Sequence, residues 1–555
     1  MSPGGLGIAA VLLFRAAGPG LEEVEREGAR WRYPSSEASA VAQWEPVLRR
    51  FLAGGGKARH SSRVLVVVYP DPAAKGRETG SSRPADLSES GKEIRVDLDA
   101  SAPKEPDGIT PVLASAAYAA RDRRLLAHPV LLAGLGARAA GRWWERDIPG
   151  FATFARKAAV EPSVADVLSS NPEMSPVIGT GAAASWIAAG VEKEGEPAVL
   201  EAIAGPEAAL EASLSRWAEA AEARPAEAPP MRRPLPPGFL RGVSYAMSNS
   251  VDSSYASPRS RETLARIAKI PADSISIMPF AFMREADSPW IGFIHRRPGG
   301  ETDEGTVRAV ADARELHMTA MVKPQLWVGR GRFVGEIAMG REDRWRLFFD
   351  NYRRFLVHHA IVSEAAGAAL FCVGTELIAT EPRAREWRET IAAVRLATGA
   401  PLLYAANWAS GAPKVPFWDA LDAIGVDFYD SLSKDAEASD SALEAGVGAA
   451  VAPLEKLAEA SRKPVIFAEA GFPAVRAAWI APHDERSGRP PFPPDAARAV
   501  SAVFRALKGK AWWRGVYWWK AFSSGQTARE NDRGYNILGA PAEKAIAEGF
   551  ARRSG

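Results

Sequence analysis

Two glutamates in the second half of the chain, Glu376 and Glu469, directly follow short apolar stretches. Cleavage of a glycosidic bond with retention of configuration needs two carboxyl groups about 5 Å apart. One is a carboxylic acid that protonates the leaving oxygen, and the other is a carboxylate on the opposite face of the scissile bond. The two glutamates are 93 positions apart (469 − 376), so the fold must bring them together. The alternative is that either one is a salt-bridged or solvated loop residue.

Aromatic and polar residues close to the same stretches favour a carbohydrate ligand. Sugar rings present apolar C–H faces that lie on indole or phenol rings, while their hydroxyl groups need polar partners. The candidates are Lys323, Gln325, Trp327, Thr375, Asn407, Trp408, Tyr429, Trp518, Trp519 and Lys520. Because successive strand residues point to opposite faces, we expect only one of Trp518 and Trp519 to face such a site and the other to pack in the core.

An alternation of short apolar runs and amphipathic helical stretches begins at Phe239 and continues through the second half of the chain. This alternation predicts parallel strands joined by helical crossovers. The strands are predicted at residues 240–245, 274–280, 318–325, 369–373, 402–406, 423–428, 465–468 and 515–519. Helices are predicted at residues 258–269, 306–316, 341–365, 383–396, 442–461 and 495–507. Eight strand–helix units in about 315 residues predict an α/β fold, a closed (β/α)8 TIM barrel.

Such a barrel explains how residues far apart in the sequence can form one site. Active sites of these barrels are built from residues at the C-terminal ends of the strands. All the candidate residues end or follow a predicted strand, and the fourth and seventh strands, which carry Glu376 and Glu469, face one another across the barrel mouth. We therefore expect a single site at this end of the barrel.

Four segments give this half of the chain a family resemblance. They are FCVGTEL (residues 371–377), PVIFAEAGF (464–472), GVYWWKAF (515–522) and DRGYNILGAPAEKAI (532–546). Together they resemble the clan-A glycoside hydrolases, and most closely family 113, the β-mannanase-like group, over residues 241–550. The likeness implies that Glu376 is the acid/base and Glu469 the nucleophile. The positions where such enzymes place sugar-binding and nucleophile-orienting groups carry Lys323, Gln325, Asn407, Trp408 and Tyr429.

Thr375 departs from the pattern of the clan, which usually has an asparagine before the acid/base to bind the sugar 2-hydroxyl. A shorter hydroxyl side chain changes that contact and leaves the substrate open. The resemblance implies hydrolysis of β-1,4-mannan in two displacements. The alternatives are a non-catalytic carbohydrate-binding barrel and a hydrolase or transglycosylase of another β-linkage.

A proline-rich segment precedes the predicted barrel. Residues 224–237 read RPAEAPPMRRPLPP, with six prolines in fourteen positions, which neither a helix nor a central strand accommodates. We therefore predict a linker at residues 224–238, between an N-terminal domain (residues 1–223) and the barrel (residues 239–555). The N-terminal domain is expected to be a separate, helix-rich α+β domain of unknown role, with a clear strand at residues 64–69.

The N-terminal domain faintly resembles gluzincin-type metallopeptidases in residues 123–136 and 175–195. The H-E-x-x-H pair that holds zinc in those enzymes is missing, because Pro129 follows His128 and neither the glutamate nor the second histidine follows at the required spacing. The resemblance therefore implies a degenerate peptidase-like domain without zinc.

The histidines and the single cysteine predict neither a metal nor another cofactor. His295, His317, His358, His359 and His483 show no ligand spacing. We expect His358 and His359 to be solvated or to interact with the end of a long helix, in its polar C-terminal part. Cys372 lies in an apolar run and is expected to be a buried apolar residue.

Composition excludes several classes of partner. The formal charge of +2 supplies no strong field for nucleic acid, and no stretch approaches the roughly 18 apolar residues of a membrane span. Residues 7–14 form a short signal-like stretch that lacks a basic segment before it and ends at Arg15. Export and oligomeric state are left open, and the expected partner is a carbohydrate.

Overall fold

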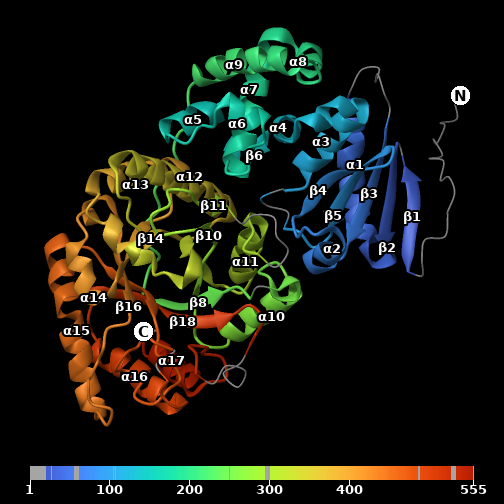
Figure 1. Cartoon of the computed structure of the whole chain (residues 1–555). Coiled ribbons are helices and arrows are strands. Elements are labelled where there is room, and N and C mark those ends of the chain that lie inside the picture. The colour runs from blue at the N-terminus through green and yellow to red at the C-terminus, as the bar shows by residue number, and fades with distance from the viewer. Residues whose placement is uncertain are drawn as a thin grey trace, which may run out of the picture. The chain divides into compact units, whose positions relative to one another are not determined.

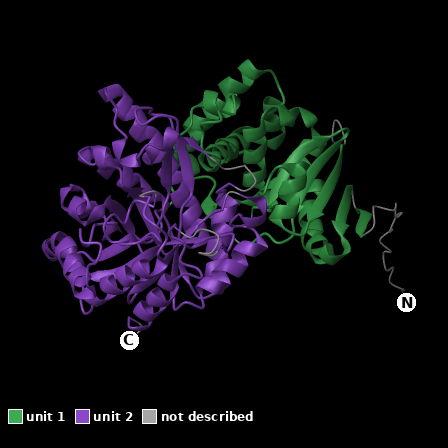
Figure 2. Cartoon of the chain, turned by 60° about the horizontal axis from the view of Figure 1, so that its bottom comes forward, with its two compact units in different colours: residues 1–155, 161–227 green, residues 156–160, 228–555 purple. Residues whose placement is uncertain are grey.

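The computed structural model describes residues 20–26, 28–54, 62–103, 106, 108–248, 250–293, 300–485, 488–526 and 533–553. The signal-like stretch at residues 7–14 and His295 lie outside the described residues. The chain divides into two compact units, Met1–Ala155 with Glu161–Glu227 and Arg156–Val160 with Ala228–Gly555 (Figure 2). The division after Glu227 falls within the residues given above as a linker. Within the described ranges, no helix has the length and apolar character needed to cross a membrane.

The first unit is a mixed α/β domain, in which a five-stranded sheet packs with helices (Figure 1). Its sheet order is β1 (Leu21–Arg26), β2 (Ala29–Pro34), β3 (Arg63–Tyr69), β5 (Glu93–Asp99) and β4 (Ala85–Ser90). The central strands β2, β3 and β5 are parallel, and the edge strands β1 and β4 are antiparallel to their neighbours. The apolar strand predicted at residues 64–69 is β3, which is buried along almost its whole length because it lies at the centre of the sheet.

The helices of this unit follow from residue 38 onward. They are α1 (Ala38–Ala53), α2 (Pro72–Thr79), α3 (Thr110–Arg121), α4 (Pro129–Ala140), α5 (Phe151–Lys157), α6 (Val164–Leu168), α7 (Pro176–Glu194), α8 (Glu196–Ile203) and α9 (Glu207–Glu222), with a short hairpin, β6 (Arg142–Trp143) and β7 (Arg146–Asp147). One apolar core joins the sheet to the helices and contains the fully buried Trp31 of β2 and Trp217 of α9.

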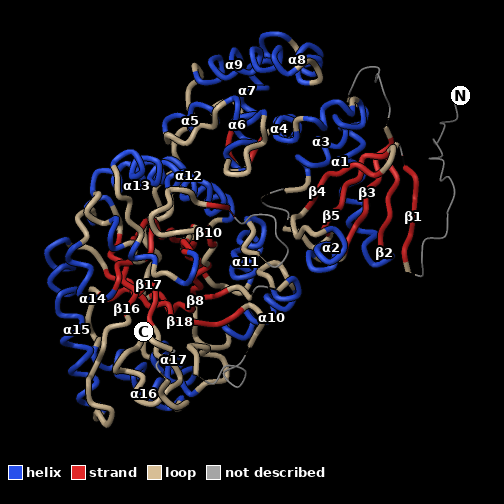
Figure 3. The backbone as a smooth tube through the Cα atoms, in the orientation of Figure 1, coloured by secondary structure: helices blue, strands red, loops and turns tan. Residues whose placement is uncertain are grey.

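The second unit is the predicted closed barrel of eight parallel strands. In chain order the strands are β8 (Leu240–Ala246), β9 (Ser274–Ile277), β12 (Thr319–Val322), β14 (Leu370–Thr375), β15 (Leu402–Asn407), β16 (Ala423–Phe428), β17 (Val465–Ala470) and β18 (Trp513–Phe522). The sheet closes where β18 pairs with β8. Figure 3 shows these strands in red, surrounded by blue helices. All eight predicted strands are present in the predicted order, although the second and third are shorter than predicted.

Helices cover the outside of the barrel, and the long ones were all predicted except the last, Pro541–Ala551. They are α10 (Pro258–Ile267), α11 (Asp303–Glu315), α12 (Glu342–Ala366), α13 (Ala384–Ala397), α15 (Asp440–Ser461), α16 (Pro493–Ala506) and α17 (Pro541–Ala551), with a short α14 (Trp408–Gly411) after β15. Apolar side chains from the strands fill the interior, including Leu370 and the predicted buried Cys372 of β14, whose thiol has a pKa raised by burial to about 11. The strands are apolar on both faces because one face meets this interior and the other meets the helices.

The structure differs from the sequence interpretation in the second and third strands, which end earlier than predicted. The barrel strands stop at Ile277 and Val322, and two separate strands follow, β10 (Phe280–Met283) and β13 (Gln325–Val328). Pro279 and Pro324 precede the new strands. A proline has no N–H for the ladder, so each one interrupts the barrel hydrogen bonding. The strands β10 and β13 pair in parallel, and β11 (Gly292–Phe293) completes a three-stranded sheet.

Candidate active site

The carboxylate of Glu469 is held by three donors at the C-terminal end of the barrel. Its side chain lies in β17 and only 7% of the residue is exposed. Lys323 Nζ and Gln325 Nε2 donate to Oε1 at 2.5 and 3.0 Å, and the Tyr429 hydroxyl donates to Oε2 at 2.8 Å. Burial and the adjacent Glu469 charge raise the pKa of Tyr429 well above its usual value, which keeps this phenol protonated as a donor. Both oxygens are therefore fixed in position.

Lys323 connects Glu469 to a second acid. This lysine is fully buried, and its Nζ also donates to Asp427, 3.2 Å from Oδ1 and 3.3 Å from Oδ2. Burial alone lowers the pKa of Lys323, but the charges of Asp427 and Glu469 outweigh that effect and raise it. Burial and the Glu469 charge raise the pKa of Asp427, and Lys323 opposes the rise. One ammonium group thus compensates two buried acids.

Glu376 follows β14 and lies within electrostatic range of this group. Its backbone is left-handed, with a φ of +55°, an uncommon conformation for a residue with a side chain and one that recurs at active sites. Burial, then the charges of Asp427 and Glu469, raise the pKa of Glu376 well above its ordinary value, and Lys323 offsets part of this rise. A carboxyl group that stays protonated at higher pH is suited to donate a proton to a leaving group.

Thr375, Asn407 and Trp408 lie at the ends of neighbouring strands, as the barrel predicts. Thr375 is the last residue of β14, and its buried Oγ1 makes no hydrogen bond within the described part of the chain. Asn407 ends β15 and is half-buried, and Trp408 follows it with a φ of +59°. The indole of Trp408 lies 5.1 Å from the ring of His483. A hydroxyl, an amide and an indole are therefore present at the mouth.

The two tryptophans of the last strand lie in different surroundings, as the alternation of side chains along a strand predicts. Trp518 is 1% exposed and packs 5.5 Å from Phe504 of α16, in the layer between barrel and helices. Trp519 is partly exposed, and the Lys520 Nζ lies 4.6 Å from its ring centroid. Burial lowers the pKa of Lys520, and nearby acidic charges, Glu469 among them, oppose this only in part. Lys520 thus lies within electrostatic range of Glu469 and in contact with the ring of Trp519, whereas Trp518 is left out of the site proposed below.

The prediction that His358 and His359 are solvated or interact with the end of a helix was wrong. Both histidines lie in the interior of α12, 0% and 6% exposed, because α12 packs against α11 over this length. His358 Nε2 lies 2.6 Å from Asp303 Oδ1 of α11. Possible ligand atoms of these three residues lie within 4.8 Å of one another, close enough to hold a metal ion. Spacing along the sequence could not reveal a group divided between two helices.

Two residues close to Glu469 are not among the candidate site residues predicted from the sequence. Asp427 bonds Lys323, and the ring of Tyr535 lies 6.1 Å from that of Tyr429. Asp427 had a detectable signal, since it is a charged residue inside the otherwise apolar strand AIGVDF. Tyr535 follows the last strand by thirteen residues (535 − 522); it lies in the segment DRGYNILGAPAEKAI that contributes to the family resemblance, but its spacing alone does not place it near Tyr429.

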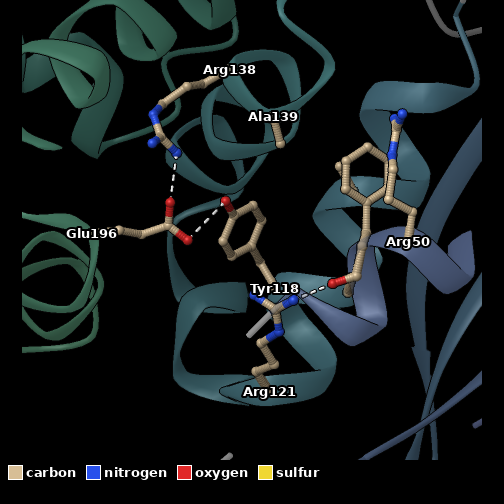
Figure 4. A pocket seen from close by; sticks show the side chains of 10 residues that line it. Arg50, Tyr118, Arg121, Arg138, Ala139 and Glu196 are labelled. Atoms are coloured by element: carbon tan, nitrogen blue, oxygen red, sulfur yellow. Dashed lines mark hydrogen bonds and ion pairs between the residues drawn. The ribbon is translucent and has the colours of Figure 1, made fainter. Parts of the chain in front are cut away.

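The first unit contains a cavity of about 330 Å³. Figure 4 shows Arg138 and Tyr118 directed at Glu196, with hydrogen bonds of 3.0 and 3.3 Å, while Arg121 donates to the carbonyl oxygen of Phe51. No histidine or cysteine is among the residues that line it. Its polar groups bind mainly one another, so this cavity offers no arrangement comparable with the one around Glu469.

Comparisons with known proteins agree with the barrel. Residues 243–540 match the model of Glycoside Hydrolase Family 113. The solved structure of the GH113 β-mannanase AaManA from Alicyclobacillus acidocaldarius, in complex with ManMIm, is 26% identical, with a TM-score of 0.52 over 57% of this chain and 98% of that chain. Two structures of a GH113 β-1,4-mannanase are 21% identical, with TM-scores of 0.51 and 0.52 over 57% of this chain and 99% of theirs. A comparison with curated protein sequences gives no match.

Proposed function

Because the chain belongs to glycoside hydrolase family 113, to whose model more than half of its length is matched, we propose that it cleaves β-1,4-mannan or a closely related β-linked saccharide with retention of configuration. The observation that carries this proposal is the arrangement of two glutamates in unlike environments. Glu469 accepts three hydrogen bonds and lies beside an ammonium group, whereas the pKa of Glu376 is raised. Carboxyl groups whose environments differ in this way can take opposite roles as nucleophile and acid.

In the first step, Glu469 attacks the anomeric carbon, and the bond from that carbon to the leaving oxygen breaks as Glu376 transfers its proton to that oxygen. The glycosyl-enzyme ester has no charge on Glu469. The pKa of Glu376 therefore falls, because one of the charges that raised it is gone. Glu376 then accepts a proton from water as the water attacks the same carbon, and Glu469 leaves as a carboxylate.

The remaining residues position the reacting groups. Lys323, Gln325 and Tyr429 hold the Glu469 carboxylate, so the attacking oxygen need not reorganise during the reaction. Sugar hydroxyls and ring faces are proposed to contact five further residues at the strand ends: Thr375, Asn407, Trp408, Trp519 and Lys520. Trp327 is proposed to bind the substrate further from the cleaved bond.

Two observations bear on the substrate. The 26% identical structure is described as a β-mannanase, which favours mannan. Thr375, however, stands at the position where an asparagine is expected by resemblance, and its Oγ1 is buried without a hydrogen-bond partner in the described part of the chain. A different contact to the sugar changes the preference among β-linkages. The test below therefore also covers the alternatives, which are a hydrolase or transglycosylase of another β-linkage and a non-catalytic binding barrel.

The test is product analysis on oligosaccharides derived from mannan, glucan, xylan and chitin. We expect cleavage of the mannan series, with products that keep the β-configuration when first released, as followed by NMR. If only another series is cleaved, the proposed substrate would change to that linkage and the proposed mechanism would stay the same. Binding to any series without cleavage would support the non-catalytic alternative.

For the first unit, the degenerate peptidase-like interpretation stays a proposal. The sequence lacks the H-E-x-x-H pair, so the unit is proposed to have a binding or packing role and no peptidase chemistry. We therefore propose that the glycosidase activity belongs to the barrel alone.

A further inference from the structure

The small sheet β11-β10-β13 follows the barrel strands β9 and β12 in the sequence and carries two exposed aromatic rings. Parallel pairing of β10 with β13 sets Phe280 opposite Gln325 and Phe282 opposite Trp327. Phe282 is 43% exposed and Trp327 is 56% exposed. The alternate residues of both strands are buried, and they are Ala281, Met283, Leu326 and Val328. The sheet therefore has one packed face and one open face, and both rings lie on the open face.

Gln325 shows where the open face is directed. Its Nε2 donates to Glu469 Oε1 at 3.0 Å, so the face that carries Gln325 is turned toward the nucleophile. Trp327 is two residues further along β13 and shares that face, about 6.8 Å from Gln325 by strand geometry. Phe282 lies beside Trp327 on the neighbouring strand, about 4.8 Å away. The two rings thus extend outward from the catalytic carboxylate.

The contacts of these rings keep the surface open and ordered. The ring of Phe280 meets the indole of Trp327 edge to face, with centroids 6.3 Å apart and an interplanar angle of 70°. This contact restricts the indole before any ligand binds, which lowers the entropy lost on binding. On the other side, Gly292 of β11 is paired with Phe282 and has no side chain to cover it. Exposed aromatic side chains gathered on one face mark binding surfaces.

We propose that Phe282 and Trp327 form a stacking platform for a sugar unit of the substrate chain beyond the units that flank the cleaved bond. The platform selects a β-linked oligosaccharide or polysaccharide over a short glycoside, because a pyranose ring with an apolar C–H face lies on the two rings only when the chain is long enough to reach them. This inference rests on the proposed function and adds a preference for chain length to it.

The test compares substrates of different length in Phe282→Ala and Trp327→Ala. The readout is the ratio of kcat/KM for a hexasaccharide of the cleaved series to kcat/KM for an aryl glycoside of a single sugar. We expect this ratio to fall about tenfold in each variant, equivalent to about 1.4 kcal/mol, mainly through a higher KM for the hexasaccharide. Trp327→Phe, which keeps an aromatic face, should restore most of the ratio. The aryl glycoside rate also reports whether each variant is folded.

Trp290→Ala is the matched control. Trp290 is 51% exposed and lies in the segment between β10 and β11, where it follows Pro289, whose carbonyl oxygen accepts a hydrogen bond from Asn351 of α12. Loss of the Trp290 indole should leave the ratio of the two kcat/KM values the same as in the unmodified chain. An unchanged ratio in both Phe282→Ala and Trp327→Ala would overturn the platform while the proposed hydrolysis stands.

A binding measurement keeps the inference testable if the chain hydrolyses no β-linked saccharide and the proposed function fails. In native gels that contain soluble mannan or glucan, the unmodified chain should be retarded and Trp327→Ala should be retarded less. Equal migration of the two proteins in every polysaccharide gel would overturn the platform.

Discussion

Glu376→Ala is the substitution whose outcome depends most on the proposal that Glu376 is the acid/base and Glu469 the nucleophile. It removes a group whose pKa is raised by burial and by the charges of Asp427 and Glu469, and leaves the three donors to Glu469 in place. General acid–base catalysis contributes about 10²- to 10⁴-fold. We therefore expect kcat on the polysaccharide to fall by about 10³-fold, or about 4 kcal/mol of transition-state stabilisation.

The assay separates the two steps through the leaving group. A dinitrophenyl glycoside needs no proton on its leaving oxygen, so Glu376→Ala should still form the glycosyl-enzyme. Hydrolysis of this intermediate by water should then be slow, because no general base remains. Added azide should raise the rate because it needs no base, and it should give a β-glycosyl azide. Glu469→Ala is the control, since azide would then take the place of the nucleophile and give the α-anomer.

The pH profile supplies a second readout. The unmodified enzyme needs protonated Glu376, so activity should be present below the pKa of Glu376 and lost as the pH rises through it. Because that pKa is raised above its ordinary value of 4.5, the loss should occur at higher pH than for an ordinary glutamate. Glu376→Ala on the dinitrophenyl substrate should lack this basic limb. Wild-type rates on the polysaccharide, or an α-azide product from Glu376→Ala, would refute the assignment.

Four further predictions follow from the same geometry. Glu469→Gln should lose nearly all activity on every substrate, including dinitrophenyl glycosides, and steady-state kinetics that show retained turnover would remove it as nucleophile. Lys323→Met should lower the free energy of unfolding by about 3 to 5 kcal/mol in urea titrations, because it leaves Asp427 and Glu469 buried without their cation; Asp427→Asn added to it should recover part of the loss. EDTA should leave activity unchanged, since the carboxylate mechanism uses no metal; loss that zinc restores would give the group around Asp303 and His358 a role in activity. Limited proteolysis should cut near residues 224–233 and release a stable barrel fragment, whereas failure to obtain one would indicate that the two units fold as one.

The barrel and the location of the candidate residues at its strand ends could be predicted because they depend on local patterns. Strands buried on both faces are apolar throughout, so each of the eight is visible in the sequence, and the polar residues that end them stand out against this background. Glu376 and Glu469 were found in this way. The topology of a closed barrel then brings the two together without any knowledge of side-chain contacts.

The features that were missed depend on partners distant in sequence or on polar strands. In the first unit, β1 reads LEEVER and β4 reads ADLSES; such edge strands are largely solvated and carry no apolar run to recognise. The burial of His358 follows from the packing of α12 on α11, which spacing within one helix does not encode. The small sheet had a signal in Pro279 and Pro324, which end two barrel strands at corresponding positions and begin the paired strands β10 and β13.

The most direct test of the double-displacement mechanism is to trap its covalent intermediate. A 2-deoxy-2-fluoro glycosyl fluoride of the preferred sugar should form a glycosyl-enzyme that hydrolyses slowly, because fluorine destabilises the oxocarbenium-like transition states of both steps while fluoride still leaves readily. Mass spectrometry of the intact chain should show one added sugar, and peptide mapping should place it on Glu469. A labelled residue other than Glu469, or turnover of the reagent with inverted product and no adduct, would contradict the mechanism.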